Sequence, residues 1–171
     1  MATTYTLISK VTVGSGGAST ITFSSIPQTY TDLVFLGTAR NSNNNYGGFF
    51  VKCNGSSAGS NVTAKRLLGD GSSAVQNGST ELLWTQSDFP ANIFTSVQMY
   101  IPNYTNTTKF KSALMDGVVE NTATDGRQQL TAWLWSQTDA ITQVEFGTFD
   151  GGFADKFVEH STMYLYGISN A

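Results

Sequence analysis

The sequence predicts an all-β domain of the sandwich type. About ten segments carry apolar residues at alternate positions or in short buried-type runs, and clusters of Gly, Asn, Ser and Pro separate them at regular intervals. No stretch of a dozen residues keeps the i, i+3, i+4, i+7 apolar stripe of an amphipathic helix. Many short strands with turn residues between them are typical of a sandwich or barrel.

The first third of the chain predicts three strands. Residues 5–13 carry apolar side chains at even spacing, which is the period of a half-buried strand, and a glycine-rich turn follows at 14–17. Residues 19–23 return as the second strand of a hairpin. After Pro27, residues 32–40 contain a run of consecutive apolar residues, which indicates a strand buried on both faces.

The rest of the chain repeats this pattern of strands and turns. Residues 109–120, for example, alternate between a set with Phe110 and Leu114 and a set with Ala113 and Met115. No linker or internal repeat divides the chain, so residues 1–171 form a single predicted domain, long enough to bury a core without disulfides or a metal. The further predicted strands are 47–53, 62–68, 81–85, 94–101, 109–120, 128–136, 141–149 and 160–168.

The composition predicts a neutral surface that is rich in hydroxyl and amide groups. Charged residues make up 12% of the chain, about half the roughly 25% of an average soluble domain, whereas Ser, Thr and Asn account for 53 of the 171 residues. Fewer charges must be desolvated when such a surface packs against another chain. The composition therefore favours assembly with copies or neighbours.

Charge and hydropathy argue against several kinds of partner. The net charge is −3 and the nine basic residues are scattered, whereas a nucleic-acid binder needs clustered Lys and Arg to neutralise phosphates. No apolar run is long enough to span a bilayer, and the amino terminus has neither the basic start nor the apolar stretch of a signal peptide. We expect the protein to bind neither nucleic acid nor a membrane, and to be made in a cytoplasm.

No residue pattern predicts catalysis. His160 is the only histidine and Cys53 the only cysteine. Neither has a partner nearby in the sequence that would complete a Ser-His-Asp or Cys-His arrangement. Asp116 and Glu120 share one face of a predicted strand, about 13 Å apart, beyond the roughly 9.5 Å upper range of a glycosidase pair. We expect no catalytic residues and no enzyme activity.

Cofactors and metals are not expected either. One histidine and one cysteine cannot supply an ordinary zinc site. The turns at 70–72 and 150–152 carry oxygen ligands but lack the alternating acidic residues and late Glu of an EF-hand. A simple turn is the favoured interpretation, with a structural calcium ion as the alternative.

Aromatic residues supply the candidate contacts. Trp84, Trp133 and Trp135 are expected in the core or at a subunit interface, because aromatic side chains dominate both, with a sugar-stacking platform as the alternative. Residues 149–157 form a turn-rich loop with several phenylalanines, and exposed rings there would mark a contact with another chain. The interface candidates are Phe149, Phe153, Phe157 and Trp84.

Several stretches of the chain resemble small virion proteins of tailed bacteriophages, particularly those of aquatic and cyanobacterial hosts. These stretches are residues 5–8 (YTLI), 21–34 (ITFSSIPQTYTDLV), 68–73 (LGDGSS) and 161–168 (STMYLYGI). The resemblance runs nearly end to end and rests on strand and turn patterns. It implies a jelly-roll β-sandwich that assembles as a homotrimer, and it carries over no catalytic residue.

The same resemblance implies a structural role on a virus particle. Members of the group look like capsid decoration (cement) proteins or tail-fibre components. The chain runs from Met1 to Ala171 without a fibrous shaft, which favours a cement protein that binds the outer face of the major capsid protein shell. We expect it on the capsid surface after synthesis in the host cytoplasm.

Two other functions remain open. The alternative is a tail-tip or fibre-head module that recognises host-surface carbohydrate with Trp and Tyr side chains. An enzyme that acts on surface polysaccharide ranks last.

Overall fold

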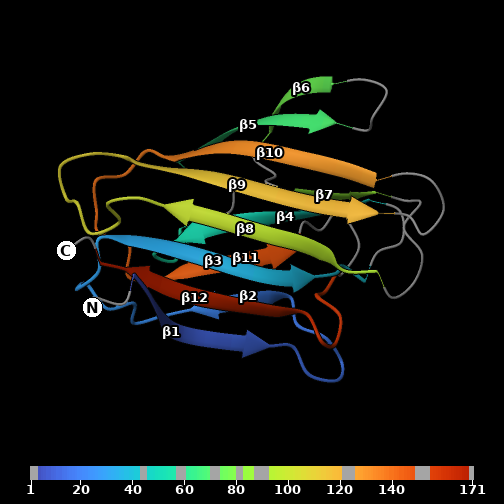
Figure 1. The fold of residues 1–171 in the computed structure, drawn as a ribbon, viewed down its shortest axis with the longest axis horizontal. Helices are drawn as coiled ribbons and strands as arrows, with labels where there is room; N and C mark the ends of the chain where they lie inside the picture. The colour runs from blue at the N-terminus through green and yellow to red at the C-terminus, as the bar shows by residue number, and fades with distance from the viewer. Residues whose placement is uncertain are drawn as a thin grey trace.

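The protein folds as two antiparallel β-sheets, seen in a computed structural model (Figure 1). The structure describes residues 4–42, 46–56, 61–69, 74–79, 83–86, 93–120, 126–148 and 155–169, with side chains except at 46–47, 74–79, 83–86 and 119–120. The strands are β1 (Tyr5–Thr12), β2 (Thr20–Phe23), β3 (Asp32–Ala39), β4 (Tyr46–Cys53), β5 (Val62–Gly69), β6 (Ala74–Ser79), β7 (Leu83–Gln86), β8 (Thr95–Ile101), β9 (Lys111–Glu120), β10 (Gly126–Trp135), β11 (Val144–Thr148) and β12 (Thr162–Ile168).

The predicted all-β class is confirmed, because the described residues contain strands and no helix. Among these residues, therefore, no helix could cross a membrane. The described strands number twelve instead of about ten. The sequence pattern missed β6, because its residues, AVQNGS, show no apolar alternation. It also placed the start of the last strand too early, since His160 lies in a turn with φ of 73° and β12 begins at Thr162.

The strands pair as a nested series. β1 pairs with β12, β2 with β11, β3 with β8 and β4 with β7, all antiparallel. The small sheet has the order β2-β11-β4-β7, and the large sheet has the order β1-β12-β3-β8-β9-β10-β5-β6. The hairpins β5–β6 and β9–β10 extend the large sheet beyond β8, so that it has twice as many strands as the sheet behind it (Figure 1).

The core lies between the two sheets and is centred on aromatic side chains. Phe35 of β3 meets Phe23 of β2 edge-on with ring centroids 5.5 Å apart, and it meets Phe146 of β11 at 5.2 Å. Such pairs contribute about 0.5–1.5 kcal/mol beyond the apolar area that they bury. β3 belongs to the large sheet and β2 and β11 to the small one, so these rings join the two sheets directly.

The strand β3 is buried on both faces, as its run of apolar residues predicts. Leu33 and Phe35 point into the core, and each has no exposed surface. Val34 points to the opposite face, where its neighbours in register are Tyr166 of β12 and Tyr100 of β8. It is 3% exposed, so side chains on the outer face of the large sheet cover it.

Gly37 of β3 allows β12 to pack closely, and Gly37→Ala is expected to destabilise the fold. A Cβ atom there would lie 2.3 Å from the Thr162 carbonyl oxygen and 2.4 Å from the Met163 sulfur. We expect the free energy of unfolding to fall by about 1–3 kcal/mol, measured by urea denaturation.

The matched control is Gly14→Ala, because no atom lies within 4 Å of a Cβ at Gly14. Its free energy of unfolding is expected to stay within about 0.5 kcal/mol of the unsubstituted protein. Equal stability of the two variants would contradict the close contact between β3 and β12.

Candidate functional site

Strand alternation leaves large apolar side chains on the outer face of the large sheet. In β9, Ala113 and Met115 point into the core and are buried, whereas Leu114 points outward and is half exposed. Single exposed apolar residues are ordinary, but a contiguous set marks an interaction surface. The large apolar residues that stay 38–56% exposed are Tyr5, Leu7, Leu67, Phe110, Leu114, Val118, Leu130 and Leu134.

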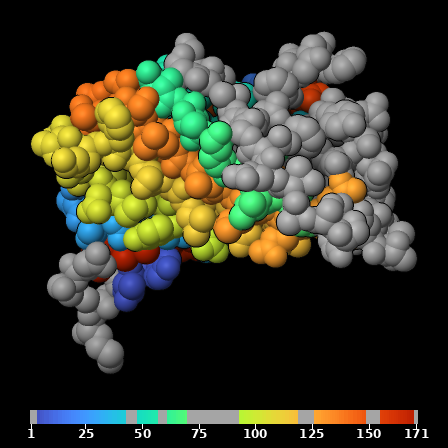
Figure 2. Space-filling view, turned by 90° about the horizontal axis from the view of Figure 1, so that it is seen from above, coloured from blue at the N-terminus to red at the C-terminus, as the bar shows by residue number. Residues whose placement is uncertain are grey.

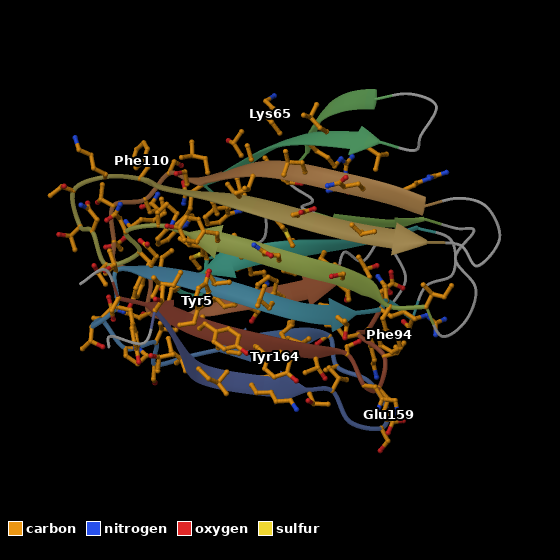
Figure 3. All side chains as sticks on the ribbon, viewed as in Figure 1. Tyr5, Lys65, Phe94, Phe110, Glu159 and Tyr164 are labelled. Carbon is orange, nitrogen blue, oxygen red and sulfur yellow. The ribbon has the colours of Figure 1, made fainter. Side chains whose placement is uncertain are left out.

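One part of this face, which we name the tyrosine patch, joins two of these residues to three partly exposed tyrosines. It comprises Tyr5, Leu7, Tyr100, Tyr164 and Tyr166 on β1, β8 and β12. The rings of Tyr164 and Tyr166 are 6.4 Å apart with planes at 23°, and the Tyr5 ring meets that of Tyr166 edge-on at 6.3 Å. Figure 3 shows Tyr5 and Tyr164 near each other on this face of the sheet. The rings therefore form one cluster across neighbouring strands.

The tyrosine patch has a fixed base. The Tyr100 hydroxyl donates a hydrogen bond of 2.8 Å to Asp32, whose other carboxylate oxygen accepts a 2.9 Å bond from the Asn103 backbone N–H. The bond to Asp32 raises the pKa of the Tyr100 hydroxyl, and burial raises it further. Tyr100 thus stays neutral at physiological pH and is held in one orientation over Val34.

A polar margin borders the patch. Thr12, Thr162, Thr38 and Ser96 follow one another in register across four strands of the large sheet. The hydroxyl groups of Thr162 and Thr12 are hydrogen-bonded at 3.1 Å. An apolar centre with a neutral polar margin is the usual anatomy of a protein interface.

The second group, which we name the leucine patch, comprises Leu67, Leu114, Val118, Leu130 and Leu134 on β5, β9 and β10. Leu130 and Leu67 are direct cross-strand partners. A shallow hollow of about 240 Å³ lies among these strands, lined in part by Leu67, Leu114 and Leu130. Figure 2 views the molecule from this edge, with β5 in green beside the yellow and orange atoms of β9 and β10.

Few of the described side chains on the outer face are charged. The Lys10 ammonium is 5.2 Å from the centre of the Tyr164 ring, a distance suited to a cation–π contact. Lys65 is exposed on β5, and one carboxylate oxygen of Asp116 on β9 is shielded from solvent without a hydrogen-bond donor in the described part of the chain. Neither Lys65 nor Asp116 has an ion-pair partner among the described residues.

The sequence-predicted interface residues do not lie on this face as far as they can be placed. Phe157 was expected in an exposed loop, but it is 1% exposed and stacks on Phe49 with ring centroids 5.0 Å apart. The Phe157 backbone N–H donates to the Ala18 carbonyl oxygen at 2.7 Å, and the Ala18 N–H donates to the Phe157 carbonyl oxygen at 3.0 Å. These two bonds hold the ring in the core. Phe157 is therefore unavailable to another chain.

The other predicted contacts lie beyond what the structure describes. Phe149 and Phe153 fall outside the described residues, and Trp84 is placed on β7 without a described side chain. Trp133 and Trp135 are each 2% exposed and belong to the core, so they offer no sugar-stacking platform.

The candidate chemical groups stay apart. His160 is exposed in the turn before β12, and Cys53 lies at the end of β4 with no exposed surface. Burial raises the pKa of the Cys53 thiol to about 12, although the charge of Lys111 opposes this. Asp116 lies on the outer face, and the side chain of Glu120 is not among those described.

Lys111 is a buried cation at the start of β9 that holds neighbouring loops by hydrogen bonds. Its ammonium group donates hydrogen bonds to the carbonyl oxygens of Lys109 at 3.0 Å and Thr138 at 3.1 Å. Burial lowers the pKa of this lysine, while Asp139 opposes the shift. Two loops at this end are thereby tied to β9.

Within the described ranges, no group of three or more His, Cys, Asp or Glu side chains is close enough to hold a metal ion. The two turns considered for calcium, at 70–72 and 150–152, lie outside those ranges.

Neither a family model, nor a curated protein, nor a solved structure matches this chain. The functional conclusion therefore depends on the outer face of the large sheet and on the sequence patterns.

The two patches were not among the residues selected from the sequence, although a signal for them was present. Residues 128–136 carry Leu130 and Leu134 opposite Trp133 and Trp135, so both faces of this strand are apolar. A strand with two apolar faces lies either in the middle of a three-layer structure or at an interface. Sequence alone does not say which of its two faces meets the core.

Cys53 is expected to be unreactive in the folded protein. At pH 8, a pKa of about 12 leaves the thiol almost wholly protonated, and burial also keeps out a thiol reagent. We expect alkylation at least about a thousandfold slower than in the urea-unfolded chain. Equal alkylation rates in the two states would contradict the burial of this residue.

Proposed function

We propose that the protein is a structural component of a virus particle, a capsid decoration (cement) protein that binds the outer face of the major capsid protein shell and stabilises it. The observation that carries the proposal is the apolar outer face of the large sheet, with large side chains that are 38–56% exposed. A contiguous apolar face on a chain with so few charges suits permanent contact with another protein. The resemblance to phage virion proteins supplies the kind of particle.

The fold proposed for this role is a jelly roll. Without the hairpins β5–β6 and β9–β10, the remaining eight strands, renumbered along the chain, have the orders 1-8-3-6 and 2-7-4-5. This order supports the proposal, because it is that of one long antiparallel hairpin curled into two sheets. Double-sheet jelly rolls are common among viral capsid proteins.

Within this function, the tyrosine patch is the proposed contact with the capsid. Tyrosine is enriched at the positions that contribute most to binding between different proteins, because its rigid ring buries a large area and its hydroxyl keeps a polar partner. The neutral hydroxyl margin needs no counter-charge on the capsid. A homotrimer on the capsid surface, made in the host cytoplasm, completes the proposal as the resemblance implies it.

Capsid binding by the purified protein tests the proposal. The protein is mixed with empty capsids that lack it, and co-sedimentation measures the bound amount. We expect stoichiometric binding that changes less than about twofold between roughly 0.1 and 1 M salt, because the tyrosine patch holds few charges to be screened.

The variant Tyr164→Ala/Tyr166→Ala is expected to weaken capsid binding at least about thirtyfold, since both rings are lost from the centre of the contact. The matched control is Phe110→Ala, which removes an exposed ring, 56% accessible, outside both patches. The control should bind as the unsubstituted protein does.

One observation supports the alternative function, in which the protein is a tail-tip module that recognises host carbohydrate. Trp133 and Trp135 are lost to the core, but the exposed ring of Tyr5 and the partly exposed rings beside it are also able to stack on sugars. Binding to host cells or glycans without binding to capsids would overturn the cement proposal in favour of this alternative.

A further inference from the structure

The leucine patch differs in chemistry from the tyrosine patch beside it. Its exposed large side chains are all aliphatic, namely Leu67, Leu114, Val118, Leu130 and Leu134. Aliphatic residues are under-represented among the strongest contacts between different proteins, whereas homodimer interfaces are more apolar than other interfaces. This composition favours contact with a copy of the same chain.

Two charged side chains that the structure describes on this part of the sheet are arranged for self-complementarity. Lys65 lies on β5 and Asp116 on β9, and β10 lies between these strands. In register, Lys65 is opposite Ala132 and Asp116 is opposite Leu130, so the two charges are offset by two residues, about 7 Å, along the strands. Each charge lacks an ion-pair partner within the described part of its own chain.

A two-fold axis along β10, in the plane between two stacked sheets, would place β5 of one copy over β9 of the other. Each Lys65 then faces the β9 strand of the other copy, displaced from its Asp116 by about 7 Å along the strands. With sheets about 10 Å apart, the extended side chains of lysine and aspartate together span this gap. The shielded carboxylate oxygen of Asp116, which lacks a donor among the described residues, would gain one. A copy of the chain thus supplies both the apolar face and the two opposite charges.

The leucine patch supplies more than half of the area that a stable dimer needs. Its three strands, β5, β9 and β10, are eight to ten residues long. At about 4.8 Å between strands and ~3.4 Å per residue, they give a footprint of roughly 460 Å² per copy. A standard stable interface buries about 800 Å² per partner, and side chains at the margin of the patch add the rest.

We propose that the leucine patch is a two-fold self-association face, covered by the leucine patch of a second copy of this chain. This assigns a second surface beyond the tyrosine patch, and it does not depend on the identity of the capsid. On a particle, such contacts would link neighbouring copies of the protein to each other and add to their attachment through multivalency.

Reversal of one charge at a time tests the proposal. Sedimentation velocity of the full chain measures the association state and the dissociation constant. Lys65→Glu or Asp116→Lys alone places like charges together at the two-fold contact, and each is expected to raise the dissociation constant at least about tenfold. The combined variant Lys65→Glu/Asp116→Lys restores opposite charges, so its constant should return to within about threefold of the original.

A matched control makes the same change in net charge at a distant position. Glu159→Lys alters the charge as Asp116→Lys does, at an exposed residue that Figure 3 shows far from Lys65. It should leave the dissociation constant unchanged. If a charge variant proves unfolded by circular dichroism, Leu130→Gln at a 40% exposed position gives an independent test with the same expected tenfold loss.

Two results would overturn the self-association proposal. One is a chain that stays monomeric up to about 100 µM, and the other is an association state that ignores both single reversals. A trimer insensitive to the reversals would contradict the self-association proposal without affecting the proposed capsid role. Charge-sensitive association of a protein that does not bind capsids would contradict the capsid role and support self-association.

Discussion

Phe35 meets Phe23 and Phe146 across the gap between the two sheets, and this contact fixes which face of each strand is inside. Because side chains alternate along a strand, the position of one inward residue decides the direction of every other residue in that strand. Register then carries the choice from β3 to β8, β9 and β10. The outward direction of Leu114 and Leu130 follows from the packing at Phe35.

The unequal size of the two sheets explains why the outer face matters. The small sheet has four strands, whereas the hairpins β5–β6 and β9–β10 enlarge the other to eight. A sandwich of this kind has one apolar interior, so only one face of the large sheet finds cover within the chain. The apolar residues on its other face remain exposed, and burying them requires another molecule.

The two patches divide this surface by chemistry. The tyrosine patch lies on strands of the nested eight-strand series, where Asp32 and Val34 support the rings from below. The leucine patch lies on the added hairpins. A chain that binds the shell through its tyrosine patch and a copy of itself through its leucine patch would cross-link the shell. Such cross-linking would stabilise the shell, as the proposed decoration role requires.

Sequence patterns predicted the strand class and most strand positions, because alternation in segments such as 109–120 and 128–136 is strong. They missed β6, which pairs with β5 through its backbone and has no apolar alternation. They also misjudged Phe157, because a ring in a glycine-rich segment looks exposed until tertiary contacts with Phe49 are known. The patches escaped notice because deciding which apolar face is outside requires the packing of both sheets.

An electron cryo-microscopy map of the particle that carries the protein tests the central claim most directly. The claim is that the outer face of the large sheet is an interaction surface on a virus shell. It predicts many copies on the capsid, with Tyr164 and Tyr166 against capsid protein and the strands β5, β9 and β10 against a neighbouring copy. A map in which this face points to solvent, while the small sheet holds the protein to its partner, would contradict it.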